Sequence, residues 1–169
     1  MPRFEPLPER RPAIVAGASS GIGAATAVEL AGRGFPVALG ARRVEKCQEL
    51  VDQIRSAGGE AVALPLDVID ADSVKGFVHR ATDELGDIEL LVAGAGDTYF
   101  GRLHEISTDT FESQVQIHLI GANRLATAVL RGCWNASVVT SSSSGPTSRC
   151  ASVRTWAPTG RRRPHSSPW

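Results

Sequence analysis

Short apolar runs alternate with longer segments of helical periodicity over the first 130 residues. The apolar runs predict four strands, at Ala13–Ala16, Pro36–Gly40, Ala61–Pro65 and Glu89–Ala93. Apolar positions spaced by three or four residues predict four helices, at Ile22–Ala31, Val44–Ala57, Asp72–Leu85 and Thr110–Leu130. Either Ser107 or Asp109 could cap the last helix. This alternation predicts an α/β fold with a parallel sheet, because parallel neighbours need a long crossover connection.

The connection between the first strand and the first helix is rich in glycine, with Gly17, Gly21 and Gly23. Glycine permits a tight turn and lets a bulky phosphate approach the backbone. The free N–H groups and the positive dipole at a helix start favour an anion. The turn therefore predicts dinucleotide binding; the alternative is a connection that only packs the strand against the helix.

The glycine spacing, G-x3-G-x-G, resembles that of the short-chain dehydrogenase/reductase family, in which the middle serines also hydrogen-bond the turn. The resemblance covers Pro12 to Leu130 and implies an incomplete Rossmann fold for residues 1–130, a doubly wound parallel sheet with the strand order 3-2-1-4. It implies hydride transfer between a nicotinamide cofactor and a small alcohol or carbonyl substrate, in a homo-oligomer. The turn residues implied to bind the cofactor are Gly17, Ser19, Ser20, Gly21, Ile22 and Gly23.

Two arginines, Arg42 and Arg43, follow the second strand, where dinucleotide folds read the adenosine ribose. An acidic residue there would accept from the 2′-hydroxyl of NAD, whereas a guanidinium pairs with the 2′-phosphate of NADP. The pair therefore favours NADP over NAD. The alternative is two solvated arginines at a helix start, which is an unfavourable place for cations.

Two further segments follow strands three and four, at the sheet edge where open parallel sheets bind ligands. In the family, a pair like Asp67-Val68 flanks the adenine, and an Asn-Asn-Ala-Gly motif stands where this chain has Ala93-Gly-Ala-Gly96. Ala93, Gly94 and Ala95 can still let a cofactor lie close to the backbone, but the amide side chains are absent. Alternatively, Asp67 belongs only to a turn before the helix that Asp70 caps.

The family's chemistry needs a serine, a tyrosine thirteen residues later and a lysine four residues after that, with tyrosine as the general acid or base. The only tyrosine here is Tyr99, and Leu103 stands four positions on. We therefore assign no catalytic residue firmly. His118 occupies the position of a family asparagine that supports a proton relay, although a histidine on an apolar helix is more often a packing residue.

Composition changes sharply after Leu130. Up to Leu130 the chain has 12 basic and 18 acidic residues, a balance of −6, whereas residues 131–169 contain six arginines and no acidic residue or lysine. Regrouping the codons one nucleotide earlier permits a serine over Pro146, a tyrosine over Thr159 and a lysine over Arg163. We interpret residues 131–169 as an out-of-frame tail, produced by a one-nucleotide frameshift that truncates the family sequence.

The competing in-frame interpretation makes Ala136–Gly145 a fifth strand, with Ser141 or Ser142 as the family serine. Without a general acid after it, that serine would only polarise a carbonyl. If the tail is out of frame, we expect an unpaired apolar edge at strand four, an incomplete dimer interface and disorder from about Asn135 onward.

Other compositional features restrict the remaining classes. The three cysteines and four histidines show no disulfide or metal-ligand spacing, so we expect a reducing, cytoplasmic setting and no metal. No apolar run approaches membrane-spanning length, and the start has no signal-peptide pattern. Arg161–Arg163 is too small a basic patch to indicate nucleic acid as a partner.

Overall fold

The computed structural model describes residues 11–139, with side chains described for residues 11–131. Its core is a parallel sheet in the order β3-β2-β1-β4, as expected. The strands are β1 (Ala13–Ala16), β2 (Val37–Ala41), β3 (Ala61–Pro65) and β4 (Leu90–Ala93). Three of them are followed by crossover helices: α1 (Gly21–Gly32), α2 (Val44–Ser56) and α3 (Ala71–Leu85). Each of these elements lies within two residues of its predicted bounds.

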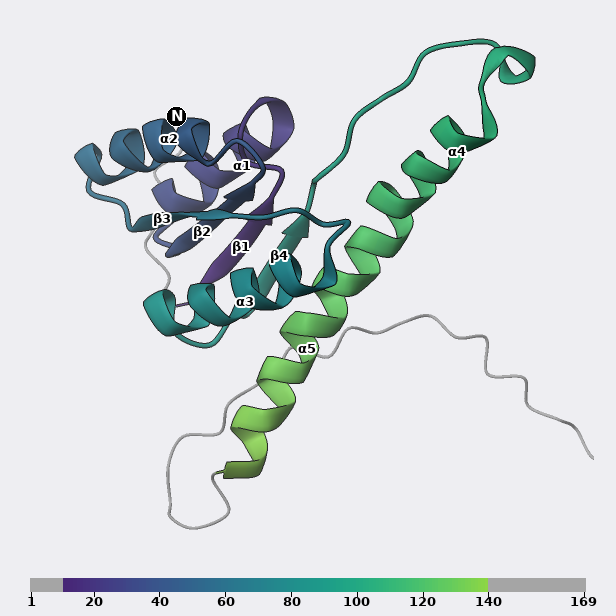
Figure 1. The fold of residues 1–169 in the computed structure, drawn as a ribbon. Coiled ribbons are helices and arrows are strands. Elements are labelled where there is room, and N and C mark those ends of the chain that lie inside the picture. The colour runs from purple at the N-terminus through teal and green to yellow at the C-terminus, as the bar shows by residue number, and fades with distance from the viewer. Residues whose placement is uncertain (1–10, 140–169) are drawn as a thin grey trace, which may run out of the picture.

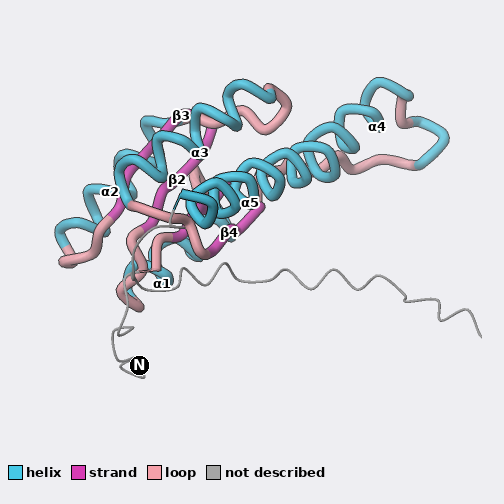
Figure 2. Tube along the Cα trace, turned by 90° about the horizontal axis from the view of Figure 1, so that it is seen from below, coloured by secondary structure: helices cyan, strands magenta, loops and turns pink. Residues whose placement is uncertain are grey.

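Both faces of the sheet are covered, which explains why the strands are apolar at consecutive positions (Figures 1 and 2). Neighbouring residues of β1 point to opposite faces: Val15 packs with Leu39 and Val51 under α1 and α2. Ile14 packs on the other face with Phe77 of α3 and Leu125. All six of these side chains are buried. The two clusters therefore fix the sheet between two helical layers, and its carboxyl edge stays available for a ligand.

The helix predicted at Thr110–Leu130 is longer than expected and is interrupted. A short 3-10 turn, η1 (Leu103–Glu105), precedes α4 (Thr108–Val115), which is continued by a π-helical segment, η2 (Gln116–Gly121), and by α5 (Ala122–Val139). Ser107 is the cap: its hydroxyl accepts the Thr110 N–H at 3.2 Å. No residue of α4 is buried, and Figure 1 shows α4 extending away from the sheet.

The competing fifth-strand interpretation is wrong within the described residues, because the backbone of 136–139 continues α5. The helix runs to Val139, and the disorder expected from about Asn135 onward stays a prediction for the rest of the tail. The helix that begins at Ala122 extends past Leu130 because no proline interrupts the sequence of residues 122–139. The rest of the proposed strand and tail, with Ser141 and Ser142, lies outside the described residues.

Strand β4 is an edge strand, as expected, since within the described part of the chain it pairs with β1 alone. Leu90, Leu91 and Val92 are only half-buried, whereas every residue of β1 is buried. An apolar strand with one unpaired side is a site for further association.

Candidate functional site: the glycine turn and its surroundings

The turn after β1 has the geometry that dinucleotide binding requires. Gly17 adopts a φ of 83°, which disfavours other residues, and its N–H donates to the Gly40 carbonyl oxygen at 2.8 Å. A Cβ at Gly17 would lie 2.5 Å from the Gly94 oxygen, and one at Gly23 would overlap the Gly17 oxygen. These two glycines are needed because backbone meets backbone there.

The start of α1 is open. Gly21 has a φ of 60°, and nothing lies within 4 Å of the position that its Cβ would take. Ser20 occupies the N-cap position in extended conformation, but its side chain makes no capping hydrogen bond. Ile22 beside it is 88% exposed. An uncapped helix N-terminus at the carboxyl edge of a parallel sheet is suited to an anionic group such as a pyrophosphate.

Arg43 lies next to this helix start. One of its guanidinium nitrogens, Nη2, donates to Ser19 Oγ at 3.2 Å and approaches Ser20 Oγ at 3.5 Å. Arg42 and Arg43 are both exposed, and Arg43 is the N-cap residue of α2. The two serines of the turn and an arginine after β2 thus form one cationic, hydrogen-bonding group, in a place where helix dipoles alone would disfavour a cation.

The segment after β4 closes the other side of the turn. Gly94 donates its N–H to the Ala16 oxygen at 3.0 Å, and Ala95 backbone atoms lie 2.7 Å from the Cβ position of Gly17. Ala93 and Gly94 are exposed. The structure therefore brings Ala93, Gly94 and Ala95 to the glycine turn, although these residues offer only backbone groups to a ligand.

Asp67 is engaged in a turn. Its carboxylate oxygen Oδ1 accepts the Ile69 N–H at 3.0 Å, and its own N–H donates to Ser73 Oγ at 2.9 Å. Asp70 caps α3 by accepting the Asp72 N–H. Val68 is buried. These contacts favour the turn alternative for Asp67, and its contact with a ligand stays a prediction.

His118, in η2, is directed at the loop after β4. Its Nε2 lies 2.8 Å from the backbone oxygen of Asp97, and its ring fills the space that a Cβ of Gly96 would need. Gln114 holds the same residue by donating to Asp97 Oδ1 at 2.9 Å. Sequence reasoning missed Asp97 and Gln114, because neither belongs to a motif and they stand 17 positions apart.

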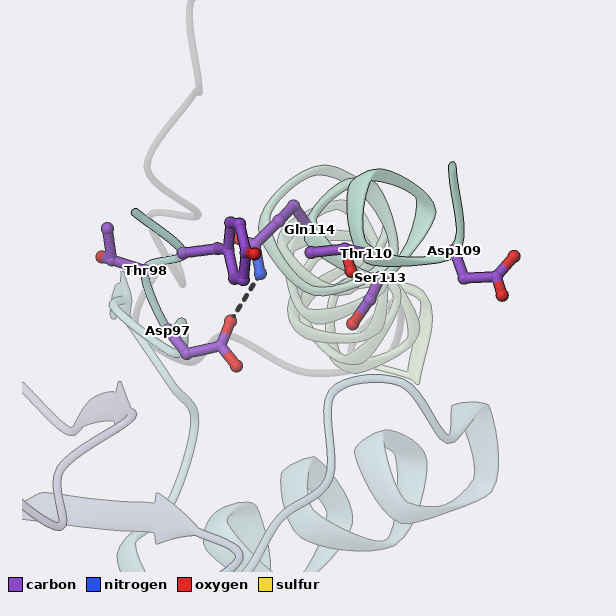
Figure 3. A pocket seen from close by; sticks show the side chains of 7 residues that line it. Asp97, Thr98, Asp109, Thr110, Ser113 and Gln114 are labelled. Atoms are coloured by element: carbon purple, nitrogen blue, oxygen red, sulfur yellow. Dashed lines mark hydrogen bonds between the residues drawn. The ribbon is translucent and has the colours of Figure 1, made fainter. Parts of the chain in front are cut away.

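A separate hollow of about 360 Å³ lies between this loop and α4 (Figure 3). It is lined by carboxylates, hydroxyls and an amide, with one aromatic ring: Asp97, Thr98, Tyr99, Asp109, Thr110, Ser113 and Gln114. Tyr99, the only tyrosine of the chain, is thus placed beside α4, and Leu103 follows it at the start of η1.

Two absences hold within residues 11–139. No group of three or more His, Cys, Asp or Glu side chains could hold a metal ion. None of the helices there is long and apolar enough to cross a membrane.

Cys47 is buried in α2, and burial raises the pKa of its thiol, although the nearby Arg43 opposes this effect.

Comparison with known proteins decides the family. The family model described as short chain dehydrogenase matches residues 11–153. The chain belongs to this family. The match of the short chain dehydrogenase model extends past Leu130, and the boundary that we place there stays a prediction.

Curated relatives of this chain include the glycine betaine reductase ATRR of Emericella nidulans, 43% identical over 118 residues. An uncharacterised oxidoreductase of Bacillus subtilis, YxbG, is 39% identical over 114 residues. The first match covers 69% of this chain and 9% of the relative, and the second covers 67% and 42%. The matched region is therefore less than half of either relative.

Solved structures agree with the fold. An alcohol dehydrogenase from Thermococcus sibiricus, complexed with 5-hydroxy-NADP, superimposes with a TM-score of 0.71 at 35% identity, over 76% of this chain and 55% of that one. A metagenomic short-chain oxidoreductase in complex with NADP superimposes with a TM-score of 0.69 at 33% identity, over 75% of this chain and 58% of that one.

Proposed function

We propose that this chain binds NADP(H) at the turn Gly17–Gly23 and belongs to an oxidoreductase that transfers a hydride between NADP(H) and a small alcohol or carbonyl substrate. The observation that carries the proposal is the group formed by Arg43 and Ser19 beside the uncapped start of α1. The helix start suits the pyrophosphate, and the guanidinium suits a 2′-phosphate. The nicotinamide supplies the hydride chemistry, and the residues named here bind and orient the dinucleotide.

The relatives support the choice of cofactor. Two solved relatives are described in complex with NADP or a derivative of it. Arg42 and Arg43 stand where an acidic residue would favour NAD. We therefore place NAD second, and assign Asp67, Val68 and Ala93 to Ala95 to the walls of the same site.

A titration of intrinsic NADPH fluorescence tests this proposal. We expect NADPH to bind more tightly than NADH. Arg43→Ala should weaken NADPH binding by about ten- to a hundredfold, because a charged hydrogen bond contributes roughly 1.5–3 kcal/mol. The affinity for NADH should change little. Arg80→Ala is the matched control, since Arg80 is an exposed arginine of α3. Equal affinities for NADPH and NADH, with no effect of Arg43→Ala, would reject the assignment.

A second candidate is a nucleotide-binding remnant without turnover. The sequence contains no Tyr-x-x-x-Lys, and His118, the catalytic candidate that lies within the described residues, is hydrogen-bonded to the Asp97 backbone. Assays with NADPH and a panel of ketones distinguish the two: binding without oxidation of NADPH selects the remnant. Sequencing the gene around the codon for Leu130 tests the frameshift, which requires that a one-base shift open a longer frame containing the missing pair.

A further inference from the structure

The π-helical segment η2 and the first turn of α5 contact two loops that border the proposed cofactor site. The first is the loop after β4. His118 approaches the Asp97 oxygen at 2.8 Å, and because a carbonyl only accepts, Nε2 carries the proton. The His118 ring also occupies the space beside Gly96. Gly96 and Asp97 directly follow the segment pressed against Gly17, so this contact fixes one wall of the site.

The second loop joins β3 to α3. Arg124, in α5, donates from Nη1 to the Ile69 oxygen at 2.6 Å and approaches the Val68 oxygen at 3.4 Å. Gly121, the last residue of η2, is buried against Val68: a Cβ there would lie 2.9 Å from two carbons of that side chain. This loop contains the Asp67-Val68 pair on the opposite wall.

The π geometry explains how one helix reaches both loops. A π turn contains one residue more than an α turn, so the helix face after it is rotated by about 100°, the angle of one α-helical residue. His118 lies inside this turn, whereas Gly121 ends it and Arg124 follows it. The interruption thereby directs His118 at one loop and Arg124 at the other.

We propose that η2 and Arg124 form a brace that holds the Val68–Ile69 loop and the Gly96–Asp97 loop at a fixed separation, and that His118, Gly121 and Arg124 are positioning residues for NADP(H). The brace rests on the proposed function, because it positions the two walls of that site. The three residues act through the loops and do not touch the dinucleotide. Loosening either contact changes the width of the whole site.

Variants of the brace test the coupling through NADPH affinity. His118→Leu and Arg124→Met should each weaken NADPH about tenfold, since each removes a hydrogen bond that fixes a wall. The double variant should lose clearly less than a hundredfold in NADPH affinity, which is the product of the two single effects, because the loss of one contact already lets the distance between the two loops vary. His118→Gln, which keeps a donor at the Nε2 position, should restore affinity. A full hundredfold loss would show two independent contacts and overturn the brace.

Gly121→Ala supplies a steric test. Alanine is the better helix former, so helix propensity alone predicts higher stability and unchanged affinity. The crowding against Val68 predicts weaker NADPH binding instead. Leu119→Ala is the matched control, because Leu119 lies in the same segment and is 67% exposed. If Gly121→Ala binds NADPH as tightly as Leu119→Ala does, the brace is wrong.

Hydrogen exchange of the unmutated chain gives a test that does not depend on how the variants fold. Adding NADP+ should slow amide exchange at 66–70 and 94–98 and also at 116–124, which the dinucleotide does not touch. Protection of the two loops with unchanged exchange at 116–124 would overturn the brace and leave the cofactor site standing. No protection anywhere, with no binding of NADPH, would reject the proposed function as well.

Discussion

Replacing Gly17 with alanine tests whether the turn is built by backbone packing. The residue has a φ of 83°, a conformation that costs alanine roughly 1–2 kcal/mol. The new Cβ would also lie 2.5 Å from the Gly94 oxygen and 2.7 Å from Ala95 backbone atoms. Because these neighbours are backbone, the carboxyl ends of β1 and β4 must separate, and overpacking of this kind costs about 1–3 kcal/mol.

We therefore expect Gly17→Ala to lose about 2–5 kcal/mol of the free energy of unfolding, measured by urea denaturation, and to lose NADPH binding. Two matched variants separate the causes. Gly21→Ala has the unfavourable φ of 60° but open space, so it should lose about 1–2 kcal/mol. Gly32→Ala, helical and uncrowded, should be neutral or gain up to about 1 kcal/mol. If Gly17→Ala is as stable as Gly32→Ala, the packing argument fails.

Three further predictions concern other parts of the fold. Asp70→Ala should lower the free energy of unfolding, measured by urea denaturation, by about 1 kcal/mol, because it removes the cap of α3. Asp72→Ala is the control: it makes the same charge change without removing the cap, so it should lower this free energy less. Burial raises the pKa of the Cys47 thiol, so the thiol of the unfolded chain ionises at a lower pH and the free energy of unfolding should fall as pH rises above 9.0. Cys47→Ala should show a shallower fall of this free energy between about pH 8 and 10.5. An equal slope for the two proteins would contradict the burial argument. Because β4 is a half-buried edge strand and α4 has no buried residue, we expect a broad thermal transition by circular dichroism and association of the protein at high concentration. A sharp transition at every protein concentration would contradict a loosely packed carboxyl-terminal side.

The sheet and the glycine turn were predictable because their signals are local. Each strand is a short apolar run ended by a turn, and the positive φ values of Gly17 and Gly21 belong to the one residue type that adopts them freely. Strand order followed from the family resemblance. The close packing of the turn was not predictable in the same way, because Gly94 and Ala95, which lie against Gly17, are 77 or more positions away in the sequence.

The interruption of the last helix was not predictable. Residues 110–130 keep an unbroken helical pattern, and the π-helical segment is set by contacts with other loops, which periodicity does not register. Arg124 reaches Ile69 across 55 positions, and His118 reaches Asp97 across 21. Arg43 and Ser19 were each assigned to the cofactor, but their mutual hydrogen bond appears only once β1 and β2 are placed side by side.

Backbone amide NMR during addition of NADP+ is the most direct test of the central claim, that the dinucleotide phosphates lie over the start of α1. The account predicts the largest shifts at the amides of 20–23, with further shifts at Gly94 and Ala95 and at Arg43. Shifts confined to the hollow beside α4, at Thr98, Thr110 and Ser113, with the glycine turn unchanged, would contradict it.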